Sequence, residues 1–396
     1  MRSDRDVVFA SAVRTAIGSF GGSLSTVPPA ELAAQVIGAA VARGGIRPAD
    51  VDHVVFGQVI PTEPRDMYLA RVAAMGAGIP KEVPAMTLNR LCGSGLQAIV
   101  SAAQSILLGD ADIAVAGGAE CMSRAPFVVP EARFGRRLGN AVMIDMLTSA
   151  LTDPFGNGHM GLTAENVAAD AGITREEQDA LALSSHRRAL RAIEEGRFRD
   201  QILPVEVTVG REKRRFCRDE HVRADASAAG LAKLRPVFKE GGTVTAGNAS
   251  GINDGAAALT VMARSEAKKR GLRPMARLVS YAHAGVDPSR MGMGPVPAVR
   301  GALAKAGLSV ARMDVIESNE AFAAQACAVA RELGFPDDRT NPNGGAIALG
   351  HPVGATGAII MVKLLHELER GGGRYGLATM CIGGGQGIAA IVEREP

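Results

Sequence analysis

Apolar stretches with the composition of buried strands alternate with helix-like stretches along the first part of the chain. Residues 6–13 and 51–60 are strand-like, and the segment between them carries apolar side chains at helical spacing. A helix-like segment at 93–109 precedes another strand-like segment, which ends at Ala119. Alternation of this kind predicts a doubly wound α/β layer that ends at about residue 120.

A second alternation of the same kind occupies the C-terminal part of the chain. It runs from a strand-like segment at 276–285 through helix-like segments to two strand-like segments at 375–383 and 387–394. The similar order of elements predicts an internal duplication, although the residues of the two halves do not match. Residues 120–248 differ, because helical stretches there alternate with loops rich in Gly, Pro and charge. We interpret them as an insertion that holds a ligand, since long loops on a rigid scaffold often carry function.

Composition narrows the class of protein. With 396 residues and a hydrophobic share of 47%, the chain can form a compact fold of about two to three units, which excludes a disordered or fibrous protein. The formal net charge of +3 is too small for a nucleic-acid-binding surface over the whole protein. Five basic residues fall among the eight from Arg211 to Arg218, and this segment either faces an anionic ligand or forms a solvated hairpin.

The cysteines and the apolar runs indicate a reducing, soluble compartment. Five cysteines are few, odd in number and widely spaced, which argues against a disulfide framework. We identify neither an apolar leader segment nor a run of about 18 apolar residues of the kind that spans a membrane. We therefore expect a cytoplasmic protein that binds neither a membrane nor nucleic acid.

Cys92 lies in TLNRLCGSGLQAI, where a strand-like run ends and Gly93 to Gly95 open a helix-like segment. The unpaired N–H groups at a helix N-terminus stabilise a thiolate, which predicts a lowered thiol pKa and a nucleophilic sulfur. The small glycines beside Cys92 leave room for a substrate. The alternative is a buried structural cysteine, because free cysteine is among the most buried residue types.

Three further residues lie in segments that favour chemistry at a thiol. His351 sits in a glycine-rich loop, NPNGGAIALGHPVGATGA, and a neutral histidine is the usual proton acceptor for a cysteine. Cys381 precedes glycines at 383–385 between two strand-like runs, and the N–H groups of such a hairpin can receive an oxyanion. Asn319 follows a strand-like run. For His351 an ordinary loop histidine remains an alternative, and for Asn319 a helix cap does.

Four short segments together resemble the signature segments of the thiolase family, in the same order and spacing. They are NRLCGSG at 89–95, NEAFA at 319–323, GHPVGATG at 350–357 and CIGGGQG at 381–387. Two more segments are similar to the coenzyme A-binding segments of that family, HMGLTAENVA at 159–168 and TVTAGNASGINDGA at 243–256. Within the family, EPRDMYLARVAA at 63–74 resembles bacterial broad-specificity β-ketothiolases that supply polyhydroxyalkanoate precursors.

The resemblance implies the thiolase fold, in which two duplicated βαβαβαββ halves form five layers (αβαβα) with an inserted loop domain. The N-terminal half is expected over residues 1–119, completed by about 249–272, and the C-terminal half over 273–396. The loop domain, residues 120–248, is expected to bind coenzyme A and to make tetramer contacts. The resemblance also implies a homotetramer, a dimer of dimers. Its substrates would be small-molecule acyl-coenzyme A thioesters, without a permanently bound cofactor or metal.

The resemblance further implies reversible Claisen condensation of acetyl-coenzyme A with acetyl- or propionyl-coenzyme A, or thiolysis of a 3-ketoacyl-coenzyme A, through an acyl-cysteine. Cys92 would be acylated, His351 would accept its proton, and Cys381 would serve as the second acid or base. Asn319 would hold a water that, with His351, binds one thioester oxygen. The backbone N–H groups of Cys92 and Gly383 would bind the other oxygen.

The family also places a set of residues around coenzyme A and the acyl group. In this chain they are Leu151, His159, Met160, Arg223, Ala246, Gly247, Ser250, Met291, Ala321 and Phe322. Arg223 would oppose the nucleotide phosphates, and Met291 would lie near the acyl group. The chain departs from the family at Ala224 and Gly230, where relatives often carry polar residues, and at Cys121, which we interpret as a packing residue.

Three alternatives compete with a thiolase. A ketoacyl synthase of the same fold typically uses a Cys and two His, and Cys381 stands where that pattern differs. A non-catalytic subunit of a β-oxidation complex would not need the intact set of Cys92, His351 and Cys381. The glycines at 156, 158 and 161 match G-x-G-x-x-G, but Pro154 interrupts the segment in which a dinucleotide-binding fold needs a strand.

Overall fold

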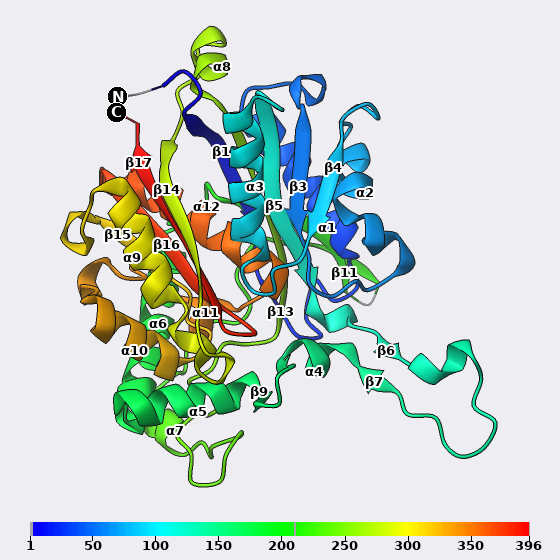
Figure 1. Ribbon diagram of the computed structural model, residues 1–396, viewed down its shortest axis with the longest axis vertical. Coiled ribbons are helices and arrows are strands. Elements are labelled where there is room, and N and C mark those ends of the chain that lie inside the picture. The colour runs from blue at the N-terminus through cyan, green and yellow to red at the C-terminus, as the bar shows by residue number, and fades with distance from the viewer. Residues whose placement is uncertain (1–2, 210, 396) are drawn as a thin grey trace.

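The computed structural model describes residues 3–209 and 211–395, and its centre is an eleven-stranded sheet (Figure 1). Most strands form one continuous order from edge to edge. That order is β15 (Val315–Ser318), β16 (Tyr375–Ile382), β17 (Gln386–Arg394), β14 (Ala276–Gly285), β1 (Val7–Thr15), β13 (Asn253–Ala263), β5 (Ile113–Cys121), β3 (His53–Gly57) and β4 (Ala85–Leu88). Two short strands lie off this order, and they are β2 (Gly18–Ser19) beside β13 and β10 (Ile202–Leu203) beside β1.

The sheet consists of two halves with the same element order. In the N-terminal half β4, β3 and β5 are parallel, and β13 and β1 continue antiparallel. In the C-terminal half β15 and β16 are parallel, and β17 and β14 continue antiparallel. A parallel bridge between Ile316 and Thr340 stands where the N-terminal half has β4. The predicted duplication is confirmed, with one strand of the second half reduced to a bridge.

Helices form three layers around and between the two halves. Those outside the N-terminal half are α1 (Pro29–Arg43) and α2 (Leu69–Gly76), and those outside the C-terminal half are α9 (Pro295–Ala306) and α10 (Ala323–Leu333). The central layer is the pair α3 (Ser94–Leu108) and α12 (Val353–Gly371), which pack against each other and against strands of both halves (Figure 1). The layers therefore follow the order αβαβα that we predicted.

Helix α3 is the most apolar helix of the central layer. Leu96, Ile99, Ala103 and Ile106 recur at helical spacing and are buried in the largest apolar cluster, which explains why this segment folds as a helix. Contrary to our expectation, the window Leu91–Leu108 is long and apolar enough for a membrane span, with a mean hydropathy of 1.4. However, 67% of that window is buried inside the protein, as in the core helix of a folded domain.

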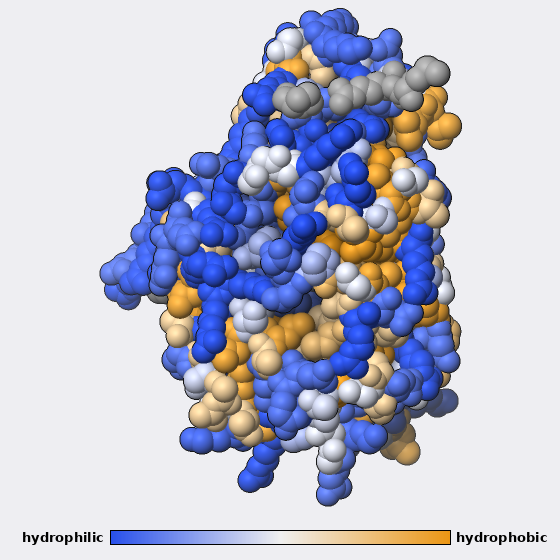
Figure 2. All heavy atoms as spheres, turned by 90° about the vertical axis from the view of Figure 1, so that its left-hand side faces the viewer, coloured by the Kyte–Doolittle hydropathy of each residue, from blue (hydrophilic) through white to orange (hydrophobic). Residues whose placement is uncertain are grey.

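The C-terminal half presents a mainly hydrophilic face with apolar areas between polar side chains (Figure 2). Helix α9 explains part of this pattern, because it buries Val296, Val299 and Leu303 against the sheet and exposes Arg300 and Lys305. Amphipathicity of this kind is typical of an outer helix whose opposite face meets solvent.

The region between β5 and β13 contains no strand of the central sheet except β10, among the residues that the structure describes. Its helices are α4 (Met146–Ala150), α5 (Met160–Ala171), α6 (Arg175–Glu194) and α7 (Ala228–Ala232). It also has three two-stranded sheets, which are β6 (Phe127–Val128) with β7 (Ile144–Asp145), β8 (Thr152–Asp153) with β9 (Gly158–His159), and β11 (Val205–Val209) with β12 (Glu212–Phe216). Helices α5 and α6 pack on α10, and α6 also contacts α11 (Ala346–Leu349).

The segment that carries β6 and β7 projects away from the rest of the molecule as an arm (Figure 1). We define the arm as residues 125–145. Helix α8 (Arg264–Lys269) follows β13 and lies near the chain termini (Figure 1). The division of the chain at residues 119, 248 and 272 remains a prediction.

Candidate active site

Cys92 lies in a tight turn between β4 and α3. Leu91, directly before it, has φ 45°, a left-handed conformation that is rare for a residue with a side chain. Two side chains fix the turn: Asn89 Oδ1 accepts from Leu91 N at 2.8 Å, and Ser94 Oγ accepts from Arg90 N at 2.8 Å. Strained backbone held in this way clusters at functional sites, because surrounding contacts must stabilise it.

The electrostatic state of Cys92 differs from our expectation. Burial raises the pKa of its thiol to about 11, although the backbone N–H groups of Gly383 and Cys92 itself donate to the sulfur and oppose the rise. The expectation of a lowered pKa from the start of α3 is therefore wrong for the free protein. Loss of water around the sulfur outweighs two N–H donors, so that the thiol is protonated at neutral pH. It needs a base to become a nucleophile.

His351 is buried just before α12, and hydrogen bonds hold both its backbone and its side chain. Its backbone N–H donates to Asn253 Oδ1 at 2.9 Å, and its Nδ1 lies 2.7 Å from Thr356 Oγ1. The Thr356 hydroxyl donates its single hydrogen to the carbonyl of Pro352 at 2.9 Å, so it must accept from Nδ1–H. The lone pair of the imidazole then lies on Nε2, which is buried without a hydrogen-bond partner among the described residues. Burial lowers the pKa of His351 to about 4, so the ring is neutral at neutral pH.

Close contact between α3 and α12 brings Cys92 and His351 to the same end of the central layer. A Cβ atom on Gly95 would lie 2.6 Å from Ala358 N, so only glycine allows the two helices to touch there. Gly357 meets Leu96 in the same way from the other helix. Since Cys92 precedes α3 and His351 precedes α12, the glycines of both motifs place the thiol and the base together.

The fully buried Glu120 ties the start of α12 and the segment after β3 to the end of β5. Its carboxyl oxygens accept from Val59 N and Gly354 N at 2.9 Å and from Ile60 N at 3.1 Å. Burial raises the pKa of Glu120 to about 8, and its charge raises the pKa of Cys92. Glu120 therefore positions the start of α12 and disfavours a free thiolate.

Cys381 lies near the end of β16, directly before the hairpin turn that leads into β17, as we predicted. Gly384 and Gly385 have φ of 81° and 83°, which the turn requires and which side chains rarely adopt. Cys381 is buried, and burial together with the neighbouring Cys92 raises the pKa of its thiol. The Gly383 N–H donates to the Cys92 sulfur, so this hairpin supplies a backbone donor at the reacting atom.

Asn319 follows β15 and does not cap a helix. Helix α10 begins at Ala323 with Phe322 in the capping position, so the capping interpretation is wrong. The Asn319 side chain is 2% exposed, and neither of its polar atoms has a hydrogen-bond partner among the described residues. Asn319 and Thr356 line the same small cavity. An unpartnered buried amide beside the residue that orients His351 fits a water-binding position.

Four of the residues that we predicted around coenzyme A and the acyl group gather around Cys381. Met160, Met291, Ala321 and Phe322 belong with Cys381 to one buried apolar cluster. Met291 lies in the 3-10 helix Pro288–Met293 before α9. The cluster therefore supplies an apolar wall for a short acyl chain.

The remaining pantetheine residues are linked to this cluster. Leu151 O accepts from Met160 N at 2.9 Å, and Ser250 N donates to Ala321 O at 3.0 Å. His159 stacks on Phe238 at 4.6 Å between ring centroids, and Phe238 meets Phe322 edge to face at 6.1 Å. Phe238 is a residue that the sequence analysis missed.

The predicted nucleotide-end residues line a separate pocket of about 160 Å³. Arg223, Ala246 and Gly247 are together there, as predicted. His186 and His221 also line it and were missed. Burial lowers the pKa of His186 to about 4, and its Nδ1 accepts from Arg223 N at 3.2 Å. Gly230, one of the departures from the family, lines the same pocket.

Two further functional residues were missed although both stand in motifs that we identified. Thr356 lies in GHPVGATG and Asn253 in TVTAGNASGINDGA. The contact between His351 and Thr356 joins a residue before α12 to the first turn of that helix, and the helical spacings of three and four residues do not signal it. No local pattern signals the bond from His351 to Asn253, because 98 residues separate them along the chain. Cys121, as expected, is a buried packing residue.

Comparisons with known proteins agree over the whole chain. The family model described as "Thiolase, N-terminal domain" matches residues 7–265, and "Thiolase, C-terminal domain" matches residues 272–394. The beta-ketothiolase BktB of Cupriavidus necator is 64% identical over 98% of this chain and 99% of its own. The acetyl-CoA acetyltransferase of Bacillus anthracis has TM-score 0.97 and 48% identity, with 98% of this chain and 99% of that chain covered.

A solved relative with a ligand also matches. Human mitochondrial 3-ketoacyl-CoA thiolase in complex with CoA has TM-score 0.96 and 46% identity, with 99% of this chain and 98% of that chain covered. Nothing in the comparisons supports the ketoacyl synthase alternative. The site combines a thiol before one central helix, a base before the other and a buried backbone donor from the last hairpin. With matches along the full length, these features lead to one conclusion. The chain belongs to the thiolase family.

Proposed function

We propose that this thiolase, an acyltransferase, moves acyl groups between coenzyme A thioesters by way of an acyl-Cys92 intermediate. The observation that carries the proposal is the Nε2 atom of His351, which is buried, lacks a proton in the tautomer fixed by Thr356, and has no partner among the described residues. A base in that state can accept the proton that burial keeps on the Cys92 sulfur.

In the first half-reaction the Cys92 sulfur attacks the thioester carbonyl carbon while its proton moves to His351 Nε2. The negative oxygen of the tetrahedral intermediate is stabilised by the N–H groups of Cys92 and Gly383, which already point at the sulfur. The bond between the carbonyl carbon and the coenzyme A sulfur then breaks, and the departing thiolate takes the proton of the Cys381 thiol. The acyl group remains on Cys92.

In the second half-reaction the Cys381 thiolate, which has given its proton to the departing coenzyme A, removes a proton from the α-carbon of another acyl-coenzyme A. The enolate oxygen is stabilised by His351 and by a water held at Asn319, whose amide has no protein partner among the described residues. The enolate carbon attacks the acyl carbonyl, and the Cys92 sulfur leaves and takes back the proton that His351 has held since the first half-reaction. Thiolysis is the same sequence in reverse, so these residues serve both directions.

The test is acylation of Cys92 followed by mass spectrometry. Incubation with acetyl-coenzyme A should add one acetyl group to the peptide that carries Cys92, and Cys92→Ser should abolish that label. Coenzyme A-dependent loss of acetoacetyl-coenzyme A absorbance should follow ping-pong kinetics. Acyl exchange by Cys92→Ser at the wild-type rate would overturn the proposal.

The proposed acyl range is broad and short, as in the supply of polyhydroxyalkanoate precursors. Met160 and Met291 line the apolar cluster at Cys381, and methionine adapts its shape to ligands of different size. The 64% identity to a protein named beta-ketothiolase supports the same assignment. Comparing kcat/KM on acetoacetyl-, 3-ketovaleryl- and 3-ketohexanoyl-coenzyme A tests it, and a strict preference for acetoacetyl-coenzyme A would contradict it.

We also propose a homotetramer, a dimer of dimers, in the cytoplasm, with no metal or permanently bound cofactor. Two exposed apolar regions support self-association. The first is the tip of the arm, where Phe134 is 93% and Leu138 90% exposed. The second is β4, an edge strand of the sheet, with the exposed Met67, Tyr68 and Met86 on or near it. Monomeric proteins seldom leave such regions uncovered.

A further inference from the structure

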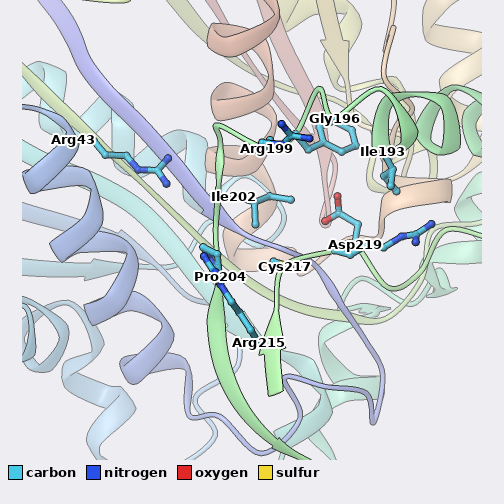
Figure 3. A pocket seen from close by; sticks show the side chains of 11 residues that line it. Arg43, Ile193, Gly196, Arg199, Ile202, Pro204, Arg215, Cys217 and Asp219 are labelled. Carbon is cyan, nitrogen blue, oxygen red and sulfur yellow. The ribbon is translucent and has the colours of Figure 1, made fainter. Parts of the chain in front are cut away.

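A pocket of about 570 Å³ lies outside the proposed acyl-transfer site. It is formed by the end of α1, the segment that follows α6, and the segment around the end of β12 (Figure 3). It shares no lining residue with the candidate nucleotide pocket around Arg223. Its size is that of a site for a small organic molecule.

Four arginines from these three segments line the pocket. Arg43 extends from α1 toward Ile202, while Arg199, Arg215 and Arg218 come from the other two segments (Figure 3). The side chains of Arg199, Arg215 and Arg218 make no hydrogen bond or ion pair with any residue in the described part of the chain. Arg43 donates to a backbone carbonyl at 2.5 Å, that of Asp200, and is partly buried, which lowers its pKa.

Two neighbouring cations on the hairpin are paired, unlike the three arginines of the pocket. On the β11–β12 hairpin Arg214 pairs with Glu212 at 2.7 Å and Lys213 with Glu206 at 3.2 Å. The solvated hairpin that we considered for the segment from Arg211 is present, with Arg215 opposite Glu206, and the exposed Arg215 and Arg218 also line the pocket.

The single carboxylate that lines the pocket does not neutralise these arginines. Asp219 is fully buried and binds Arg14 through both oxygens, at 2.7 and 2.9 Å. Arg14 is itself fully buried on β1. The charge of Asp219 is therefore balanced within the protein, and the pocket keeps an excess of positive charge.

The rest of the lining is apolar. Ile193, Phe198, Ile202 and Pro204 lie between the arginines. A simple inorganic anion would leave this surface in water, whereas an organic skeleton would cover it. Guanidinium groups bind phosphate and carboxylate through paired N–H donors, and several of them favour a ligand with several anionic groups.

We propose that this pocket binds a small organic polyanion, a carbon skeleton that carries two or more phosphate or carboxylate groups. The site is independent of acyl transfer, because none of its arginines belongs to the candidate active site. Fructose 1,6-bisphosphate and citrate are the probes, since they carry phosphate and carboxylate groups respectively on skeletons of similar size.

Calorimetric titration of the intact protein with each probe at low salt tests the proposal. Wild type should bind at least one probe at one site per chain, and added salt should weaken binding. Arg199→Gln with Arg215→Gln should weaken binding at least about tenfold, since each lost charge-assisted hydrogen bond is worth that much. The matched control is Arg273→Gln with Arg312→Gln, which removes the same charge from exposed arginines outside the pocket. The control should bind as wild type does.

Cys217 reports where the probe binds. It lines the pocket and is the exposed member of the five cysteines, so it should alkylate first with iodoacetamide. Bound probe should slow alkylation of Cys217 in wild type and in Arg223→Gln, which disables the nucleotide pocket, but not in the Arg199 and Arg215 double variant. Thiolysis by that double variant should be unchanged.

Three results would overturn the proposal. The first is that wild type binds neither probe saturably. The second is that the control and pocket double variants lose the same amount of affinity for the probe. The third is that a bound probe leaves the alkylation rate of Cys217 unchanged. A preference for one probe would assign the phosphate or the carboxylate chemistry. Failure of the acyl-Cys92 experiment would leave these outcomes unaffected, because they measure no turnover.

Discussion

At the residue scale, the candidate site holds an acid and a base in their neutral forms. Burial raises the pKa of Cys92 to about 11 and lowers that of His351 to about 4, so both shifts oppose a resting thiolate–imidazolium pair. Proton transfer must therefore accompany attack on the substrate. The orientation of His351 becomes decisive, because only the tautomer with an unprotonated Nε2 can accept the proton.

Thr356→Val tests that orientation. The valine has a similar shape but cannot accept from His351 Nδ1–H, so the ring loses the contact that fixes its tautomer. We expect kcat for thiolysis to fall about ten- to a hundredfold, with KM for coenzyme A nearly unchanged. Thr356→Ser keeps the hydroxyl and should retain most activity. Equal rates for the valine and serine variants would show that Thr356 does not orient the base.

The buried neutral His351 also makes stability depend on pH. Its folded-state pKa of about 4 lies below the ordinary value of 6.5, so between these values the unfolded chain binds a proton that the folded protein does not. The free energy of unfolding should consequently fall as pH drops through this window, by up to about 3 kcal/mol from His351 alone. Above about pH 6.5 both states are neutral and the effect vanishes.

His351→Gln isolates this contribution. Urea unfolding at about pH 7 and about pH 4.5 should show a smaller acid-induced loss for the variant than for wild type. His186, whose pKa is also lowered to about 4, is present in both proteins and cancels in the comparison. An identical acid-induced loss in the two proteins would mean that His351 protonates freely in the folded state.

At the element scale, the contact between α3 and α12 decides where the thiol and the base lie. Gly95→Ala would place a Cβ atom 2.6 Å from the backbone nitrogen of Ala358, which cannot move without its helix. We expect a loss of about 1–3 kcal/mol in the free energy of unfolding and a marked loss of kcat, because the helix starts must separate. Chemical denaturation and thiolysis rates measure both.

Gly38→Ala is the matched control for that substitution. Gly38 lies inside α1, and a Cβ atom there would meet nothing within 4 Å. Alanine should raise the free energy of unfolding by up to about 1 kcal/mol, since glycine weakens a helix interior, and activity should not change. Equal stability losses at both positions would show that the helix contact is not what Gly95 protects.

The helices and strands around this contact were predictable because short sequence patterns within each element specify them. The β16–β17 hairpin follows from glycines at 383–385 between two apolar runs, and α3 follows from apolar spacing after Gly93 to Gly95. The pKa direction at Cys92 was not predictable from its neighbours. It depends on burial by strands and helices from both halves, whereas the helix start that we recognised is a weaker, local effect.

Hydrogen-bond partners that lie far apart along the chain could likewise not be predicted from local sequence patterns. Asn253 reaches His351 across 98 residues, and β13 must return to the centre of the N-terminal half before that bond exists. Asn319 illustrates a different difficulty. Its position after a strand fitted a helix cap as well as it fitted a residue of the active site. Only the complete fold shows that its amide has no hydrogen-bond partner among the described residues.

At the scale of the whole molecule, the two halves share one central layer, and the inserted region covers the C-terminal half. Helices α5 and α6 contact α10, and Met160 of the insertion packs in one cluster with Met291, Ala321 and Phe322 of the duplicated core. The residues proposed for coenzyme A therefore come from both the insertion and the core. The arm takes no part in this packing and leaves its apolar tip in solvent (Figure 1). We propose that this tip contacts another copy of the chain.

Phe134→Ser with Leu138→Ser tests the arm as the contact between dimers. These are among the most exposed large apolar side chains of the described residues, and their replacement removes apolar area that association would bury. Light scattering after gel filtration should show a tetramer for wild type and a dimer for the variant. Leu107→Ser with Leu108→Ser is the control, because these leucines are exposed at the end of α3, away from the arm. A variant of wild-type mass, or a wild type that is itself a dimer, would exclude this function of the arm.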